Sequence, residues 1–294
     1  MMTTLFRFAL ALYPAAYRRE RGAEMTAVFE QTTAGAGRPA AAREVLDLAA
    51  YGLRLRTGLT FGGLPGRVLG AAAPLVLGLL AGVTLLNLLV DVDYSVLSRP
   101  LGYAVTGCSV LLLVAGLAGR WTVTRLAAGL TAAGVVLLFG LHASALMLGL
   151  RWALVSLVWL TLAPVLSAML LWLVPADLRP RASWRQAGLV AAGLALSVAL
   201  HLSRYLYSFG HTGRGTLLVL LLLSVLLVAA GRGAVRTAAV ALAVLPYVLQ
   251  EATFDIVKVA TGANGPAAAV GLMCAVSGLA YALLTRRGKR AVTG

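Results

Sequence analysis

The chain has 294 residues, of which 60% are hydrophobic and only 12% are charged. Soluble domains carry about 25% charged residues, so the composition excludes an ordinary water-soluble protein and indicates one that resides in a membrane. The formal net charge is +15. Because the cations lie between apolar runs, we expect them to contact the anionic membrane surface, and we expect no nucleic-acid binding.

Residues 1–68 form a water-facing prefix, since they hold five of the ten acids and nine of the 25 cations. We expect two short amphipathic cytoplasmic helices in it. The first begins at Pro14, because proline suits the first turn of a helix, and it ends before Pro39. The second covers residues 40–59. We expect no cleavable signal peptide, because the short apolar run from Leu5 to Leu12 leads into Pro14 and a charged segment instead of a small-residue cleavage site.

Apolar residues fall on one face of each prefix helix. They are Tyr17, Met25, Val28 and Phe29 in the first and Val45, Leu46, Ala49 and Leu53 in the second. Two such helices bury little area alone, so these faces must meet each other, the bilayer surface or a partner. Three arginines next to the first span favour the inner membrane surface: Arg54, Arg56 and Arg67. A solvated helix pair that anchors the N-terminus and a module that docks a protein partner both remain open.

Eight apolar stretches approach the roughly 20 residues that a helix needs to cross a bilayer core. They cover approximately residues 69–90, 101–119, 126–149, 152–174, 187–205, 215–231, 237–257 and 265–285. A basic tail, residues 286–294, follows. The chain is therefore predicted to be an all-α polytopic membrane helix bundle of about eight transmembrane helices.

The distribution of Lys and Arg predicts the orientation of the bundle, because positively charged loops stay in the cytoplasm. With eight spans and an inside N-terminus, 20 cations fall inside and five fall outside. The outside cations are Arg99, Arg151, Arg204, Arg214 and Lys258. Four of the five tryptophans lie at span ends, where these side chains are enriched. We therefore expect both termini in the cytoplasm and the protein in the bacterial cytoplasmic (inner) membrane.

Placing an ionisable side chain inside a membrane span costs free energy, so such residues mark candidate functional sites. Glu251 and Asp255 lie four residues apart, hence on one helical face, where they could bind a cation or share a proton. We favour the alternative that the helix ends near Gln250 and that outer water solvates both carboxylates. His201 and Arg204 lie near the outer end of the fifth span, from where Arg204 could reach either carboxylate.

The other polar and small residues of the spans are interpreted as structural. His142 is expected to form a hydrogen bond with a neighbouring helix. Asp91 and Asp93 mark a water-exposed loop, although they could bind a cation. Three pairs of small residues would let helices approach closely, although a chain rich in Ala and Gly contains such pairs by chance. They are Gly78/Gly82, Gly188/Ala192 and Gly193/Ser197.

The chain lacks the common catalytic motifs, namely a phosphate-binding GxxxxGK[ST] loop, HExxH, CxxC and GxSxG. Its three histidines are dispersed, and its two cysteines, Cys108 and Cys274, lie in apolar runs. We therefore expect no metal site, no cofactor, no disulfide framework and no enzymatic activity.

Several short motifs in the prefix carry a resemblance to a known group. They are LYPAAYR at residues 12–18, GAEM at 22–25, EVLDL at 44–48 and GLRLR at 52–56. Together they resemble the N-terminal segment of a group of uncharacterised actinobacterial integral membrane proteins, and loosely the prefix of some bacterial transporter permeases. The resemblance covers about the first 60 residues. It implies a membrane location and no particular chemistry.

These observations favour a non-enzymatic polytopic protein whose prefix lies on the inner membrane surface and could dock a partner. The second hypothesis is a small secondary transporter or permease subunit whose polar site comprises His201, Arg204, Glu251 and Asp255. An intramembrane enzyme is a third hypothesis, which no group of residues supports.

Overall fold

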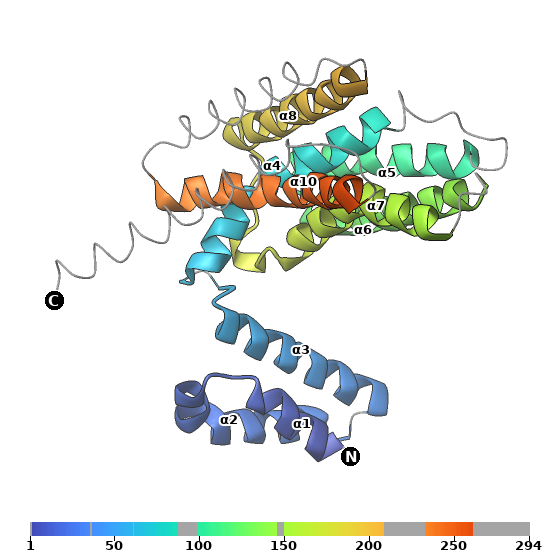
Figure 1. Ribbon diagram of the computed structural model, residues 1–294. Coiled ribbons are helices and arrows are strands. Elements are labelled where there is room, and N and C mark those ends of the chain that lie inside the picture. Colours follow the sequence, from blue (N-terminus) through green and yellow to red (C-terminus); the bar gives the residue numbers. More distant parts are fainter. Residues whose placement is uncertain are drawn as a thin grey trace. The chain divides into compact units, whose positions relative to one another are not determined.

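The computed structural model describes residues 2–35, 37–60, 62–87, 99–145, 150–208 and 233–260. These residues are helical, with no strand among them (Figure 1). The chain forms two compact units, Met1–Arg67 and Val68–Gly294, and each is described by itself.

The first unit contains three helices, α1 (Met2–Ala11), α2 (Ala15–Thr33) and α3 (Arg38–Thr57). The prediction of two helices was therefore incomplete, since the short apolar run near the N-terminus is also a helix. Such a short helix is marginal by itself, and packing against the other two stabilises it.

The core of the first unit consists of Phe6, Ala9, Phe29 and Val45, one or two side chains from each helix. The rings of Phe6 and Phe29 stack with their centroids 4.3 Å apart and their planes 18° apart. Phe29 and Val45 thus point inward, as their helical faces predict. Leu46, which was assigned to the same apolar face as Val45, points outward instead and is 68% exposed.

Glycine and proline set the limits of α3. Pro39 lies in its first turn, so the helix begins at Arg38, slightly earlier than predicted. At its end, Gly58 has a φ of 71°, a left-handed conformation that glycine adopts without steric cost. The amides of Gly58 and Leu59 donate to the carbonyls of Leu55 and Arg54 at 3.3 and 2.9 Å, which is the Schellman arrangement.

The second unit is a bundle of long helices. They are α4 (Leu64–Leu86), α5 (Arg99–Leu117), α6 (Trp121–Ala145), α7 (Leu150–Leu173), α8 (Trp184–Ser208) and α10 (Ala234–Ala260), with a short 3-10 turn, η2 (Ala176–Leu178), between α7 and α8. Among the described residues, four helices are long and apolar enough to cross a membrane, namely α4, α5, α6 and α8. They suggest a membrane-embedded protein.

The predicted count of eight spans is not reached in the described part of the chain. Besides the four qualifying helices, α7 and α10 contribute shorter apolar stretches, Thr161–Leu173 and Ala234–Gln250. The predicted spans at 215–231 and 265–285 lie outside the described residues, as do Asp91 and Asp93.

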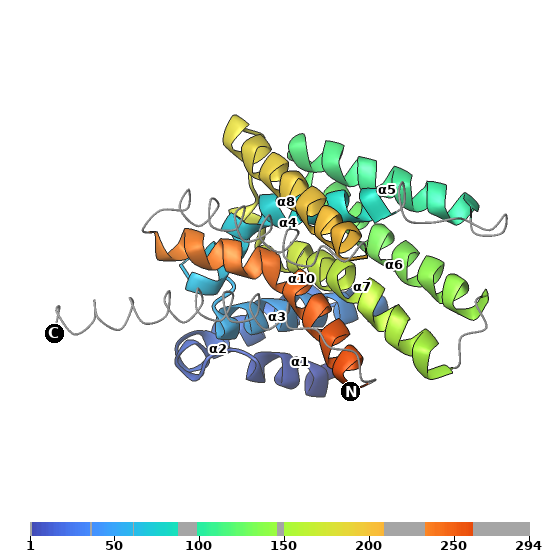
Figure 2. The same cartoon turned by 45° about the horizontal axis from the view of Figure 1, so that its top comes forward.

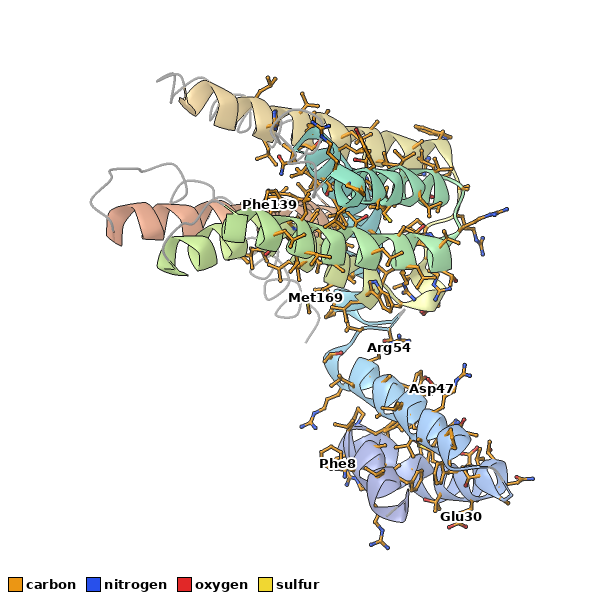
Figure 3. All side chains as sticks on the ribbon, turned by 90° about the vertical axis from the view of Figure 1, so that its right-hand side faces the viewer. Phe8, Glu30, Asp47, Arg54, Phe139 and Met169 are labelled. Carbon is orange, nitrogen blue, oxygen red and sulfur yellow. The ribbon has the colours of Figure 1, made fainter. Side chains whose placement is uncertain are left out.

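Helix α4 supplies much of the bundle's core, because Leu77, Leu79 and Leu80 are fully buried. Helices α5 and α6 pack through a cluster of Val105, Val135 and Leu138, with Phe139 at its edge (Figure 3). Helix α6 packs in turn on α7, and α7 on α10.

Helices α4 and α8 cross where two of the three predicted small-residue pairs meet. Figure 2 shows α8 lying across α4. A Cβ atom built on Gly78 would collide with the carbonyl oxygen of Val190 and lie 3.1 Å from the Cα of Gly193, and one built on Gly82 would collide with Ser197. The third pair has no such role at Gly188, where a Cβ atom would meet nothing within 4 Å.

Candidate functional site

The four residues of the predicted polar cluster lie on two helices. His201 and Arg204 belong to α8, and Glu251 and Asp255 belong to α10. The side chain of His201 is buried. The other three side chains lie outside the described set, so their convergence stays a prediction.

Helix α10 corrects one expectation. It continues to Ala260, so the interpretation that the helix ends near Gln250 was wrong. An apolar stretch followed by two carboxylates resembles a helix end in the sequence, but both carboxylates lie inside a continuous helix. Their spacing therefore does place Glu251 and Asp255 on one helical face.

Buried polar groups accompany this part of α10. Tyr247 and Gln250 are one helical turn apart, and each is 1% exposed. The hydroxyl of Ser167 on α7 donates to the phenol oxygen of Tyr247 at 3.4 Å. The side-chain oxygen of Gln250 is buried and has no hydrogen-bond partner among the described residues. Ser167 and Tyr247 were not singled out in the sequence, since such residues are common in apolar helices; their pairing depends on how α7 and α10 pack.

Arg125 holds α6 against the C-terminal end of α7. Its guanidinium donates to the carbonyls of Leu171, at 3.4 Å, and Val174. In return, the indole nitrogen of Trp172 donates to the carbonyl of Arg125 at 2.9 Å. A cation at this position satisfies carbonyls left open at the helix end and interacts favourably with the helix dipole. Helix α6 begins at Trp121, so Arg125 lies inside the helix, whereas the predicted span begins near residue 126.

Other hydrogen bonds join the loops at the same end of the bundle. The indole nitrogen of Trp121 donates to the carbonyl of Pro180 at 2.6 Å. The side-chain nitrogen Nε2 of Gln186 donates to the carbonyl of Gly116, near the end of α5, at 2.7 Å. The start of α6 and the start of α8 are thereby held beside the end of α5.

The first unit exposes several apolar and several basic side chains. Phe8 is 72% exposed, Leu53 is also exposed, and Arg56 and Arg67 are exposed near the end of the unit. Arg54 is half-buried. Figure 3 labels Phe8 and Arg54 in this unit.

Tyr13 is a buried polar residue of the first unit. Its ring stacks on that of Tyr17, with the centroids 5.4 Å apart, and it fills the space beside Gly52, where a Cβ atom would lie 2.6 Å from the ring. Burial raises the pKa of Tyr13 to about 12, and the neighbouring tyrosines contribute to this rise. Tyr13 belongs to the LYPAAYR motif, which therefore has a packing role.

No group of three or more His, Cys, Asp or Glu side chains that could hold a metal ion occurs among the described residues. Cys108 is a free thiol within α5.

Comparison with protein-family models, with curated proteins and with solved structures finds no match. The resemblance of the prefix to the actinobacterial group stays an expectation.

Proposed function

We propose that this is a non-enzymatic polytopic protein of the bacterial cytoplasmic membrane, whose N-terminal unit lies on the inner membrane surface. The bundle of about eight helices anchors it, with both termini in the cytoplasm. Four apolar helices of sufficient length among the described residues, and the excess of cations on the predicted inner side, support this proposal.

The observation that carries the proposal is the outward face of α3. With a helical step of 100° per residue, Leu46, Ala50 and Leu53 share this face, and all three are exposed. Arg43 and Arg56 flank it and are also exposed. An apolar strip between cations is typical of helices that lie in the membrane interface.

The charge and the exposed apolar area of the first unit fit an anionic leaflet. Residues 1–67 contain nine arginines against five carboxylates, and each cation near such a surface contributes about 1 kcal/mol. Burial of the exposed part of Leu46 contributes about 1–2 kcal/mol more. Together a few such groups suffice for stable surface contact.

A fluorescent probe on this face tests the proposal in the full chain. Cys108 and Cys274 are replaced by alanine, and a single cysteine at Ala50→Cys is labelled with a polarity-sensitive dye in nanodiscs. A matched control carries the dye at Glu30→Cys, which Figure 3 labels on the other side of the unit from Arg54.

We expect the probe at position 50 to shift to the blue, and to be quenched by spin-labelled acyl chains, in nanodiscs that contain phosphatidylglycerol. The probe at position 30 should remain in water. A probe at position 50 that emits as in water in both anionic and neutral nanodiscs would contradict the proposal.

A protein partner is the alternative occupant of the same face. The double variant Leu46→Glu and Leu53→Glu of the full chain would then lose a partner that co-purifies with the unmodified protein. The same double variant would also impair insertion into lipid, so it cannot by itself separate a protein partner from the membrane. The dye measurement at position 50 separates these two occupants.

A second candidate function is a small secondary transporter with the polar site His201, Arg204, Glu251 and Asp255. The continuity of α10 through both carboxylates favours it, because a cation or proton site requires them on one helical face. Proteoliposomes loaded with a pH-sensitive dye test for proton flux. Flux that Glu251→Gln abolishes would support this function, and no flux above that of protein-free liposomes would count against it.

A further inference from the structure

Two loops that carry arginines are in contact at one end of the bundle. Arg120 lies between Gly119 and Trp121, and Arg181 lies between Pro180 and Ala182. The flanking residues meet, since the Trp121 indole donates to the Pro180 carbonyl at 2.6 Å. A Cβ atom on Gly119 would lie 3.3 Å from the Ala182 nitrogen. The backbones at Arg120 and Arg181 are therefore held close together.

The conformation of the first loop is fixed by Gly119. This residue has a φ of 71°, and the amides of Gly119 and Arg120 donate to the carbonyls of Gly116 and Ala115 at 3.0 and 2.8 Å. The Schellman arrangement ends α5 and turns the chain toward the second loop. Arg120 is thus placed by a rigid turn.

Four arginines gather here with little compensating charge. We call Arg120, Arg179, Arg181 and Arg185 the arginine cluster. Arg120, Arg181 and Arg185 are exposed. Arg179 is half-buried, and its buried Nε atom has no hydrogen-bond partner in the part of the chain that the structure describes. The nearest carboxylate along the chain is Asp177, the one carboxylate among the bundle residues whose side chains are described.

The arginine cluster differs from Arg125, whose guanidinium is already engaged by carbonyls at the end of α7. Like charges held together by two packed loops repel each other, and the positive end of the α8 dipole adds to the same field. An anion placed between the arginines would relieve this repulsion, and the planar guanidinium group of arginine can donate two parallel hydrogen bonds to phosphate oxygens.

Exposed apolar groups adjoin the cluster. Trp184 is 80% exposed, and the Arg185 guanidinium lies 5.5 Å from its ring centroid. Trp172, Leu173 and Leu189 are also exposed at this end of α7 and α8. A soluble anion would gain nothing from these side chains, whereas a lipid would contact them with its glycerol and acyl groups, and tryptophan is enriched at headgroup level.

We propose that the arginine cluster binds the phosphate group of an anionic phospholipid of the inner leaflet. Arg120 and Arg181 donate to the phosphate from opposite loops, and Arg179 and Arg185 add charge beside it. Trp184 contacts the apolar part of the same lipid. This site belongs to the bundle alone and does not depend on the surface role proposed for the first unit, whereas its assignment to the inner leaflet rests on the proposed topology.

Lipid titration of the delipidated full-length protein in neutral detergent, followed by native mass spectrometry, tests the site. The probes are phosphatidylglycerol, phosphatidylcholine and inorganic phosphate. The test variant is Arg120→Gln with Arg181→Gln. The control is Arg99→Gln with Arg236→Gln, which removes two exposed arginines from the first turns of α5 and α10.

We expect the unmodified protein and the control to retain phosphatidylglycerol in preference to phosphatidylcholine. The test variant should bind phosphatidylglycerol about thirtyfold more weakly, since each cation at an anionic lipid surface contributes about a factor of five. Equal affinity of the test variant and the control would overturn the proposal. So would equal binding of both lipids, or inorganic phosphate that competes as strongly as the lipid does. Because the substituted arginines are exposed, the variant should elute as the unmodified protein does on size exclusion.

Discussion

The crossing of α4 and α8 gives the sharpest prediction about stability. A Cβ atom at Gly193 would lie 2.5 Å from the Leu75 carbonyl oxygen, 2.9 Å from the Leu79 nitrogen and 3.0 Å from the Gly78 Cα. All three are backbone atoms, which cannot rotate away. In Gly193→Ala the helices must therefore separate by about 0.9 Å to bring the shortest contact from 2.5 to 3.4 Å.

Overpacking of this kind costs about 1–3 kcal/mol, and a gap of about 0.5–1 Å forfeits a quarter to a half of the dispersion energy of each separated contact. We therefore expect Gly193→Ala to lower the folding equilibrium constant by a factor of about 5–150. Gly188→Ala is the matched control, because it changes the same residue type in the same helix, where a Cβ atom meets nothing within 4 Å.

Reversible unfolding by sodium dodecyl sulfate in mixed micelles, followed by circular dichroism, measures both variants. Gly188→Ala should unfold at the same detergent fraction as the unmodified protein or at a slightly higher one, since alanine favours the helix. If Gly193→Ala unfolded at the same detergent fraction as Gly188→Ala, α4 and α8 would not cross where the structure places them.

Three further predictions concern single side chains. Phe6→Ala should destabilise the first unit by about 3–5 kcal/mol, and the amide hydrogens of α1 to α3 should then exchange faster. Phe8→Ala should leave these exchange rates unchanged, and equal exchange in both variants would refute the assigned core. The pKa of Tyr13 is raised to about 12 in the folded protein, so the contribution of neutral Tyr13 to folding stability is complete below pH 10 and is lost as the pH rises to 12. A tyrosinate absorbance titration should therefore show a group that ionises near pH 12 and that Tyr13→Phe removes. A titration in which Tyr13→Phe removes no such group would contradict this. Arg125→Met should destabilise the bundle by about 1–2 kcal/mol through the lost helix-end contacts, with Arg99→Met as the neutral control in the same detergent unfolding assay.

Composition and hydropathy predicted the helical class and the approximate positions of α4, α5, α6 and α8, but the predicted count of eight spans is not reached among the described residues. These properties are local, since a run of apolar residues that is too long for a soluble core has few alternatives to a membrane helix. The inward positions of Phe29 and Val45 followed from helical periodicity alone.

The features that the sequence did not predict depend on contacts between distant segments. Helix α1 forms because Phe6 stacks on Phe29, and nothing within its ten residues indicates that partner. Arg125 precedes the predicted span at 126–149, yet it lies inside α6, where its guanidinium donates to carbonyls at the end of α7.

The same reason applies to the small residues and to the arginines. Three similar pairs of small residues occur in the chain, and only the packing of α4 on α8 distinguishes Gly78/Gly82 and Gly193/Ser197 from the third. The arginine cluster likewise arises because two loops about 60 residues apart in the chain meet through the bond from Trp121 to Pro180.

The central claim is that the helices cross the membrane with the arginine-rich end in the cytoplasm. Labelling of single cysteines in intact bacterial cells with a membrane-impermeant maleimide tests it most directly, in a chain without Cys108 and Cys274. Arg99→Cys, at the start of α5, should be labelled from outside. Arg181→Cys, which lies beside the other end of α5, should be labelled only after the cells are opened. Labelling of Arg181→Cys in intact cells, with Arg99→Cys protected, would contradict the account.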